Sequence, residues 1–226
     1  MTAKHDMLSE QICQKLQEDQ GLGVYDLKVR VYQDGVVQVQ GIVDVLEEKL
    51  RAEQLISSFP EVKKIENDIT VCTDGGIDDE DVAFEVSEEL RANPEVPDSV
   101  GVRVVGGEVQ LVGSVSNCNE VEEALETAAK ARGVREISSL LKVAETVDDV
   151  TLTNQVQSVL TDELAIIPGR IRVKVDDGVV TLSGNTPKEV ALEAVDIAGS
   201  VTGVKRVVNQ IDDSQPNPAD YVKMED

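Results

Sequence analysis

The stretch that decides the fold is Asp34-Gly-Val-Val-Gln-Val-Gln-Gly41, because closely similar stretches occur twice more along the chain. They are Gly106-Gly-Glu-Val-Gln-Leu-Val-Gly113 and Asp177-Gly-Val-Val-Thr-Leu-Ser-Gly184, which follow at intervals of 72 and 71 residues. Each begins with two residues that accept a positive φ and continues with apolar residues at alternate positions. The pattern predicts the turn and second strand of a β-hairpin, and its repetition predicts three copies of one structural unit.

Two further patterns precede each copy. Apolar residues alternate strictly over 27–31, 100–104 and 171–175, as in the first strand of a hairpin with one buried face. Before that strand, apolar residues at i, i+4 and i+8 form one stripe of a helix, and acidic or hydroxyl residues stand near its beginning. The stripes are Leu8/Ile12/Leu16, Val82/Val86/Leu90 and Leu152/Val156/Leu160.

Two patterns also follow each copy. Stretches rich in Ala, Glu and Val, such as 120–132 and 187–201, predict a second helix. A final strand is predicted where Glu61-Val-Lys-Lys-Ile65 is echoed by Gly133-Val-Arg-Glu-Ile137 and Gly203-Val-Lys-Arg-Val207. The predicted fold class is therefore α+β, with three tandem αββαβ modules, each having two helices packed on one face of a three-stranded mixed sheet.

The repeats divide the chain into expected domains. We expect modules over residues 1–73, 78–144 and 148–213, joined by short acidic linkers near 73–80 and 144–150. Residues 214–226 contain two prolines and three acids, which predicts a flexible acidic tail. Such a tail could present Tyr221 and Val222 as a short docking peptide.

The order of these motifs resembles the BON module, a family named for bacterial osmotically induced and nodulation proteins. The third copy is close to the family pattern, whereas the second departs from it at Gly106, Glu108 and Ser139. The resemblance extends over nearly the whole chain. It implies a non-enzymatic binding module of envelope and osmotic stress proteins, for which phospholipid contact is the usual proposal. In a related architecture it implies a sensor of small cations.

The composition excludes several classes of function. With 21 Lys+Arg against 44 Asp+Glu, the formal net charge is −23, so we expect no nucleic-acid partner. No apolar run reaches the roughly 20 residues that span a bilayer, and residues 1–20 carry no hydrophobic signal core. We therefore expect a cytoplasmic location for the chain as written, and a periplasmic one only if a leader has been removed.

No group of residues indicates catalysis. The single histidine, His5, lies outside the repeats, so no base near neutrality serves a hydrolytic triad. Cys13, Cys72 and Cys118 suit neither a disulfide framework nor a zinc ribbon, and only Cys118 precedes a helix whose dipole could activate a thiol. Nucleotide-binding, zinc-protease and EF-hand signatures are missing from the sequence. We expect free thiols, no required cofactor and no enzymatic activity.

Clustered carboxylates permit a cation site, because Ca²⁺ and K⁺ take oxygen ligands. The candidate ligands lie before two of the predicted helices and at one predicted turn; they are Asp78, Asp79, Asp81, Asp148, Asp149, Asp176 and Asp177. The same residue types cap helices and form turns, so a purely structural role is the alternative interpretation.

Phospholipid contact is disfavoured by charge. The second helix of the middle copy combines few cations with many acids, namely Lys130 and Arg132 against Glu120, Glu122, Glu123 and Glu126. A helix that lies on a membrane surface instead needs a basic rim, so this one would repel anionic lipid.

Basic residues are concentrated on the predicted first strands, where they alternate with the buried positions; they are Lys28, Arg30, Arg103, Arg170, Arg172 and Lys174. All should project from the sheet face opposite the helices. We interpret this basic stripe as a surface that docks on an acidic face of a neighbouring module, in the same chain or in a second copy. The alternative is a solvated face on which Lys and Arg stems cover the sheet.

The favoured hypothesis is a non-enzymatic tandem-repeat protein of osmotic or envelope stress, which acts through a ligand, a protein partner or self-association. The alternative is a sensor of potassium or calcium, in which carboxylates and carbonyls at the junctions between modules close around the ion.

Overall fold

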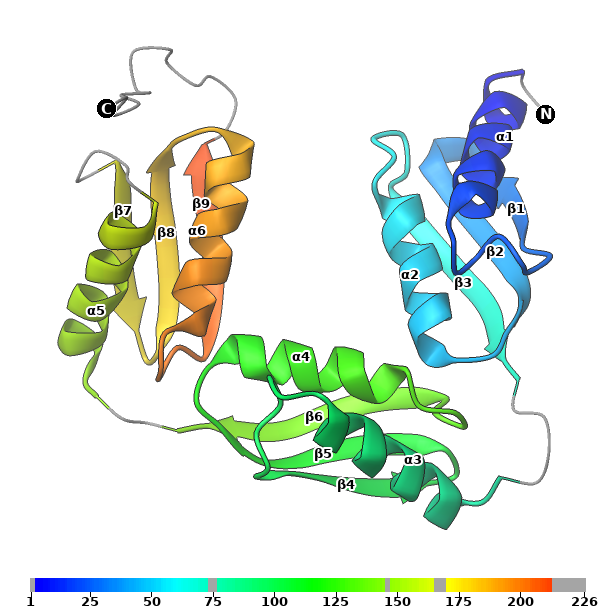
Figure 1. The fold of residues 1–226 in the computed structure, drawn as a ribbon. Coiled ribbons are helices and arrows are strands. Elements are labelled where there is room, and N and C mark those ends of the chain that lie inside the picture. The colour runs from blue at the N-terminus through cyan, green and yellow to red at the C-terminus, as the bar shows by residue number, and fades with distance from the viewer. Residues whose placement is uncertain (1–2, 73–76, 145–146, 165–169, 213–226) are drawn as a thin grey trace, which may run out of the picture. The chain divides into compact units, whose positions relative to one another are not determined.

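The computed structural model describes residues 3–72, 77–144, 147–164 and 170–212, and Figure 1 shows its ribbon. The first module contains α1 (Ala3–Glu18), β1 (Lys28–Val31), a 3-10 turn (Gln33–Gly35), β2 (Val36–Val43), α2 (Leu46–Ser57) and β3 (Lys64–Val71). The second contains α3 (Asp79–Ala92), β4 (Val100–Val105), β5 (Glu108–Val115), α4 (Cys118–Ala129) and β6 (Glu136–Val143). The third contains α5 (Asp149–Glu163), β7 (Ile171–Asp176), β8 (Val179–Asn185), α6 (Lys188–Ser200) and β9 (Arg206–Asp212).

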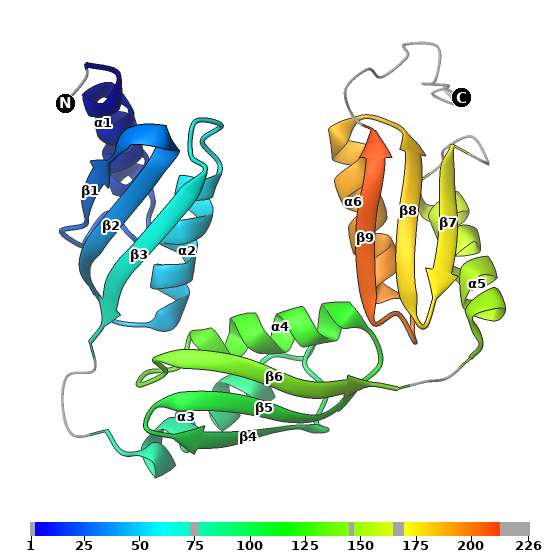
Figure 2. The same cartoon turned by 180° about the vertical axis from the view of Figure 1, so that it is seen from behind.

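Each module forms its own three-stranded sheet, with strand orders β1-β2-β3, β4-β5-β6 and β7-β8-β9. In the first and third sheets the hairpin is antiparallel and the last strand joins the middle strand in parallel, so the sheets are mixed. Helices cover one face, and Figure 2 shows the strands of the other face. This arrangement confirms the predicted α+β class and the αββαβ order.

The predicted helical stripes form the cores. Leu8, Ile12 and Leu16 of α1 are buried against Val37 and Val39 of β2 in the first module. The stripe of α5 is buried in the same way in the third module, against a set that includes Ile171, Val180 and Leu182. Full burial of each such side chain contributes about 1.5–3 kcal/mol, so the stripe and the inner strand positions supply the main stabilisation.

A glycine closes the second strand where another backbone approaches it. Gly184 has a φ of 154°, and a Cβ there would collide with the carbonyl oxygen of Arg170. Gly113 has a φ of 128° and is placed in the same way against the carbonyl of Ser99. In the second and third copies the closing glycine is therefore required both by its backbone conformation and by the lack of space for a side chain.

Gly184→Ala should destabilise the third module by about 1–3 kcal/mol, because alanine must adopt a disfavoured φ or displace the neighbouring backbone. Thermal unfolding, with hydrogen exchange of β8 amides to localise the effect, measures this loss. Gly106→Ala is the matched control, since Gly106 also has a positive φ, of 63°, but its added Cβ meets nothing within 4 Å. Equal losses in the two variants would contradict the steric argument.

One nearly buried carboxylate joins the two helices of the first module. Asp19 accepts hydrogen bonds from the amides of Gly21 and Leu22 at 3.0 and 3.2 Å, just after α1. Arg51 of α2 donates to the same carboxylate at 2.8 and 2.9 Å, while the Asp19 side chain is only 9% exposed. The hydrogen bond from Arg51 holds the pKa of Asp19 below its ordinary value.

This lowered pKa predicts an acid-sensitive contribution to stability. Because folding depresses the pKa of Asp19, its contribution is present above the unfolded value of about 3.9 and is lost as the pH falls through the folded value. Arg51→Gln should lower the urea midpoint at pH 7 and make the fall in midpoint on acidification shallower. Lys64→Gln removes an exposed pair with Glu66 and should change neither quantity measurably.

Candidate functional site

The exposed sheet face of the third module carries a basic surface. Arg172 and Lys174 of β7 are exposed and stand opposite Ser183 and Thr181 of β8 in the hydrogen-bonding register. Arg206, exposed at the start of β9, stands opposite Val179 of β8 on the same face. We call Arg172, Lys174 and Arg206 the basic surface; they flank a middle strand whose outward residues are uncharged. Asp176 and Asp212, at the ends of the outer strands, lie on the same face.

Arg206 was missed as a site residue by the sequence analysis, although a signal was present. It alternates with Val207, which packs against the core, so its side chain belongs to the opposite face. Arg170, by contrast, precedes β7, is half-buried and has a polar partner. Arg170 was predicted to project from the sheet face with the other residues of the basic stripe, but it lies outside the strand.

The corresponding face of the first module also carries three cations, Lys28, Arg30 and Lys64, and two carboxylates, Glu66 and Asp68. Lys28 and Arg30 of β1 are exposed, as predicted, and stand opposite Gln40 and Gln38 of β2. The third strand of this face carries Glu66 and Asp68, of which Glu66 pairs with Lys64 at 2.8 Å and Asp68 accepts from Gln38 at 2.6 Å. In the second module Arg103 is exposed on β4. The cations of the stripe thus lie on three separate sheets.

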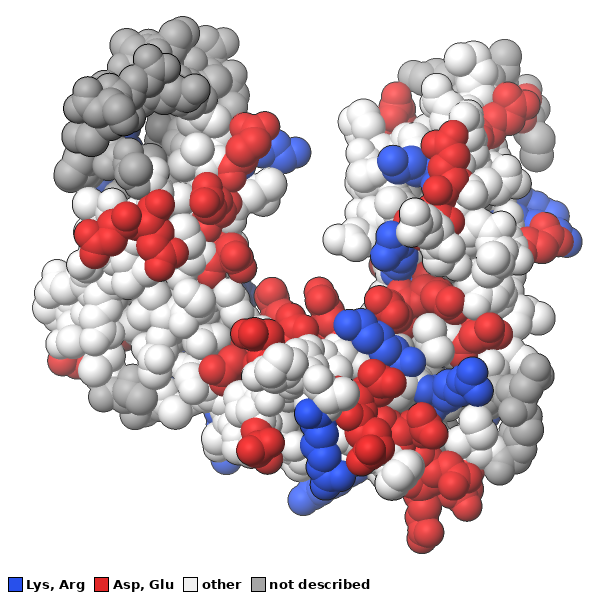
Figure 3. All heavy atoms as spheres, viewed as in Figure 1, with Lys and Arg blue, Asp and Glu red and all other residues white. Residues whose placement is uncertain are grey.

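Carboxylates are spread over the face that carries the helices. Figure 3 shows them over α4 of the middle module, the helix that carries the four glutamates identified in the sequence. The middle module therefore presents an acidic surface over α4, whereas the first and third sheet faces carry cations together with carboxylates.

The predicted cation ligands before the helices act as caps. Asp78 accepts from the amides of Glu80 and Asp81 at the start of α3, and Asp81 completes the capping box. Asp148 accepts from the amides of Val150 and Thr151 and from the Thr151 hydroxyl at the start of α5. The backbone hydrogen bond from Thr151 holds the pKa of Asp148 below its ordinary value. These contacts are those of helix N-caps.

Two other aspartates connect the first helix of a module to its hairpin turn. Asp79 of α3 accepts from the amides of Gly106 and Gly107 at 2.8 and 3.0 Å, one bond to each oxygen. Asp149 of α5 accepts in the same way from the amides of Asp177 and Gly178 at 2.8 and 3.0 Å. We call this arrangement the turn clamp. It occupies both oxygens of each carboxylate with protein donors.

The remaining candidates lie at the turn of the third module. Asp177 pairs with Lys205 at 3.0 Å, and Asp176 ends β7 opposite Val179. Among the described residues, no three His, Cys, Asp or Glu side chains are grouped so that they could hold a metal ion. The cation site stays a prediction, since the segments expected at the module junctions extend beyond the described residues, as does the expected docking peptide at Tyr221 and Val222.

Cys118 lies in a contact between the beginning of α4 and the end of α6, both of which belong to one compact unit of the chain. The Gly203 amide donates to the Ser116 carbonyl at 2.8 Å, and the Asn117 and Asn119 side chains each donate to a carbonyl at 3.0 Å, those of Ser200 and Asp196. The Cys118 thiol lies 3.5 Å from the Gly199 carbonyl. Burial, and secondarily the charge of Glu122, raises the pKa of this thiol. The helix dipole therefore does not activate it.

The contact predicts a difference in thiol reactivity. Cys72 is exposed, whereas Cys118 is half-buried and has a raised pKa, so a maleimide should label Cys72 much faster. Asn119→Ala removes the hydrogen bonds to Asp196 and should speed the labelling of Cys118 several-fold. Gln14→Ala, a change at an exposed residue of α1, is the control and should leave the Cys118 rate unchanged. Equal rates for Cys72 and Cys118 in the parent chain would contradict the contact.

The turn clamp predicts a contribution to the stability of the third module. Asp149→Ala leaves the amides of Asp177 and Gly178 without their acceptor and should destabilise the third module by about 1–2 kcal/mol. Hydrogen exchange at these two amides should become faster. Asp162→Ala, near the other end of α5, changes the charge equally without touching the turn and should leave that exchange unchanged.

No described helix combines the length and the apolar character that a membrane crossing requires.

Comparison with known proteins identifies the repeated unit. The family described as BON domain matches residues 5–73, 78–145 and 148–212. The chain is 30% identical over 140 residues to the outer membrane lipoprotein DolP of Haemophilus influenzae, covering 58% of this chain and 72% of that protein. It is 27% identical over 143 residues to the 21 kDa hemolysin of Actinobacillus pleuropneumoniae, covering 60% and 74%. It is 36% identical over 91 residues to the osmotically-inducible protein Y of Escherichia coli, covering 40% and 45%.

These relatives correct the expected location. The sequence predicts a cytoplasmic location, because no leader or membrane span is recognised in it. That expectation is wrong, since the relatives include a protein named as a lipoprotein of the outer membrane. Hydropathy reports on segments that cross a membrane, and it is uninformative about the compartment in which a folded module works.

Proposed function

The chain belongs to the BON domain family, and from this premise we propose that it is a non-catalytic binding and assembly protein of the bacterial envelope under osmotic or envelope stress. The names of its relatives, an outer membrane lipoprotein and an osmotically-inducible protein, support this setting. The proposal assigns recognition to the module surfaces.

The observation that carries the proposal is the basic surface of the third module. Its three cations stand on the two outer strands around an uncharged middle strand and outnumber the two carboxylates of that face, Asp176 and Asp212, on a protein whose net charge is −23. Such a local reversal of sign favours contact with an acidic protein surface. The helix-bearing face of the middle module supplies one, so a second copy of this chain is the partner we propose.

Charge reversal tests the proposal. The triple change Arg172→Glu, Lys174→Glu and Arg206→Glu should abolish assembly, which light scattering measures as the mass in solution. Each exposed ion pair contributes about 0.2–1 kcal/mol, so the loss of three pairs should weaken association by roughly ten-fold, and the new repulsion should weaken it further. The parent assembly should also dissociate in high salt, because screening acts on exposed charges.

A matched control separates the basic surface from net charge. Reversal of the exposed Lys15, Lys64 and Lys188, which lie neither on the basic surface nor on the middle module, changes the net charge equally and should leave the mass unchanged. An equal loss of mass in both triple variants, or a parent chain of single-copy mass at every salt concentration, would overturn the proposal. The parent chain could also float with anionic phospholipid vesicles. If reversal of Arg172, Lys174 and Arg206 abolished that flotation, the basic surface would bind lipid and the assembly proposal would be overturned.

A further inference from the structure

The hairpin turn of the first module contains the same pair of positive-φ residues as the two turns that are clamped by an aspartate, although its connection is one residue longer and includes the 3-10 turn Gln33–Gly35. Asp34 and Gly35 have φ values of 64° and 78°, close to the 63° and 80° of Gly106 and Gly107. The Gly35 carbonyl accepts from the Lys63 amide at 2.8 Å, as the Gly178 carbonyl accepts from the Lys205 amide at 2.9 Å. The three pairs of positive-φ residues are therefore held against the last strand of their modules in the same way.

The first helix of this module lacks the aspartate. The clamp residues Asp79 and Asp149 stand three positions before the first buried residue of their stripes, Val82 and Leu152. The same count from Leu8 of α1 leads to His5. Among the described residues, no side chain accepts a hydrogen bond from the amide of Asp34 or Gly35.

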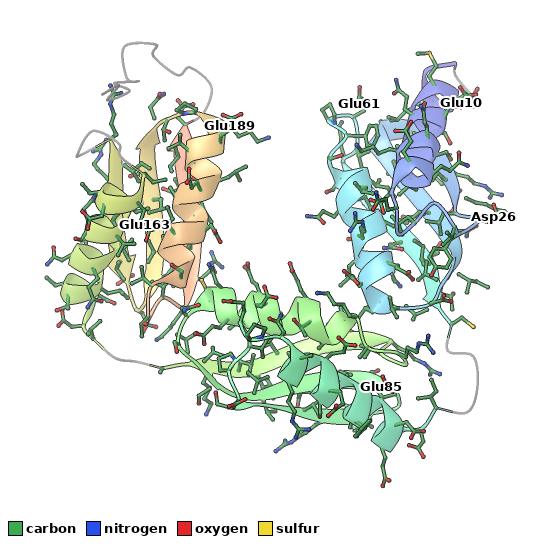
Figure 4. The ribbon with its side chains drawn as sticks, viewed as in Figure 1. Glu10, Asp26, Glu61, Glu85, Glu163 and Glu189 are labelled. Atoms are coloured by element: carbon green, nitrogen blue, oxygen red, sulfur yellow. The ribbon has the colours of Figure 1, made fainter. Side chains whose placement is uncertain are left out.

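A pocket lies where the carboxylate would be. Its volume is about 460 Å³, and the residues around it come from the start of α1, the turn and the loop before β3. Figure 4 labels one of them, Glu61, on that loop. The polar groups around it include His5 and Lys63, and the apolar wall contains Met7, Leu8 and Val31.

We propose that this pocket binds a carboxylate from a ligand, in the place that Asp79 and Asp149 fill in the other two modules. The turn amides would donate to the two oxygens, and His5 and Lys63 add an imidazole and an ammonium group at the same pocket. The apolar wall favours a carboxylate attached to a small apolar group over a bare inorganic anion. The proposal is independent of the basic surface, which lies on another module.

The acidic residues of the pocket are compatible with this ligand. Asp34 and Glu61 also line it, and either could repel an anion. In the third module, however, Asp177 occupies the position of Asp34, and there the Asp149 carboxylate still accepts from both turn amides. Lys205, which pairs with Asp177, corresponds to Lys63 of the first module. The third module thus holds two carboxylates and one lysine at the same turn.

Amide chemical shifts of the full chain test the proposal. Titration with N-acetyl-leucine, at ionic strength matched with NaCl, should shift the amide signals of Asp34 and Gly35 in a saturable manner. The amides of Asp177 and Gly178 should not respond, because Asp149 already occupies them. Inorganic phosphate should give a smaller response, and a larger response to phosphate would overturn the choice of a carboxylate.

Two variants change the turn clamp in opposite directions, one by adding it to the first module and the other by removing it from the third. His5→Asp should supply the missing clamp, shift the Asp34 and Gly35 amides without ligand, and abolish their response to N-acetyl-leucine. Asp149→Ala should open the equivalent turn and give the Asp177 and Gly178 amides a response that they lack in the parent chain. An unchanged response in His5→Asp would overturn the proposal, as would amides of Asp34 and Gly35 in the parent chain that respond to no carboxylate probe. Retained thermal unfolding shows that each variant is folded.

A peptide arm identifies the source of the carboxylate. An amidated peptide with one internal aspartate offers a side-chain carboxylate, whereas N-acetyl-leucine offers a terminal one. A saturable response of Asp34 and Gly35 to either supports the proposal, and the stronger response names the source. Failure of both, with the fold intact, would exclude a carboxylate ligand.

Discussion

Two consecutive residues with positive φ reverse each hairpin, and their amide hydrogens point away from the β-ladder, where they need an acceptor. In the second and third modules an aspartate from the first turn of the preceding helix accepts from both amides, and so one interaction ties the helix to the hairpin. The helical stripe behind that aspartate then falls directly on the inner face of the sheet. Local turn chemistry and the packing of the core are thereby coupled in these two copies.

Repetition of a small fold allows its copies to diverge at single positions. The turn clamp is complete in two modules, while in the first the aspartate is replaced by His5 beside a pocket. The sheet faces differ as well, since the carboxylates of the first, Glu66 and Asp68, both lie on the last strand, whereas those of the third, Asp176 and Asp212, lie at the ends of the two outer strands. Such differences leave the core unchanged, because the exposed strand positions and the turn lie outside the buried set.

The sequence predicted the modules well because their signals are periodic. Alternation at 171–175 and the stripe of Leu152, Val156 and Leu160 correspond to β7 and α5, whose inward residues form one core. The roles of individual polar residues were harder to predict. Asp148 and Asp149 are adjacent and identical in type, yet one caps its own helix and the other reaches a turn 28 residues further along the chain.

Cys118 and Arg206 illustrate the same limit. A position at the start of a helix indicates a lowered thiol pKa. The contact with α6 instead buries Cys118, and this burial raises the pKa of its thiol. Arg206 joins Arg172 and Lys174 only because parallel pairing places β9 beside β8. By itself, the sequence determined the repeat, the element order and the buried faces, since periodicity is a local property of the chain. Only the tertiary structure decided which carboxylates meet which amides, which cations share a face and which turn stays open, because those depend on contacts between residues far apart in sequence.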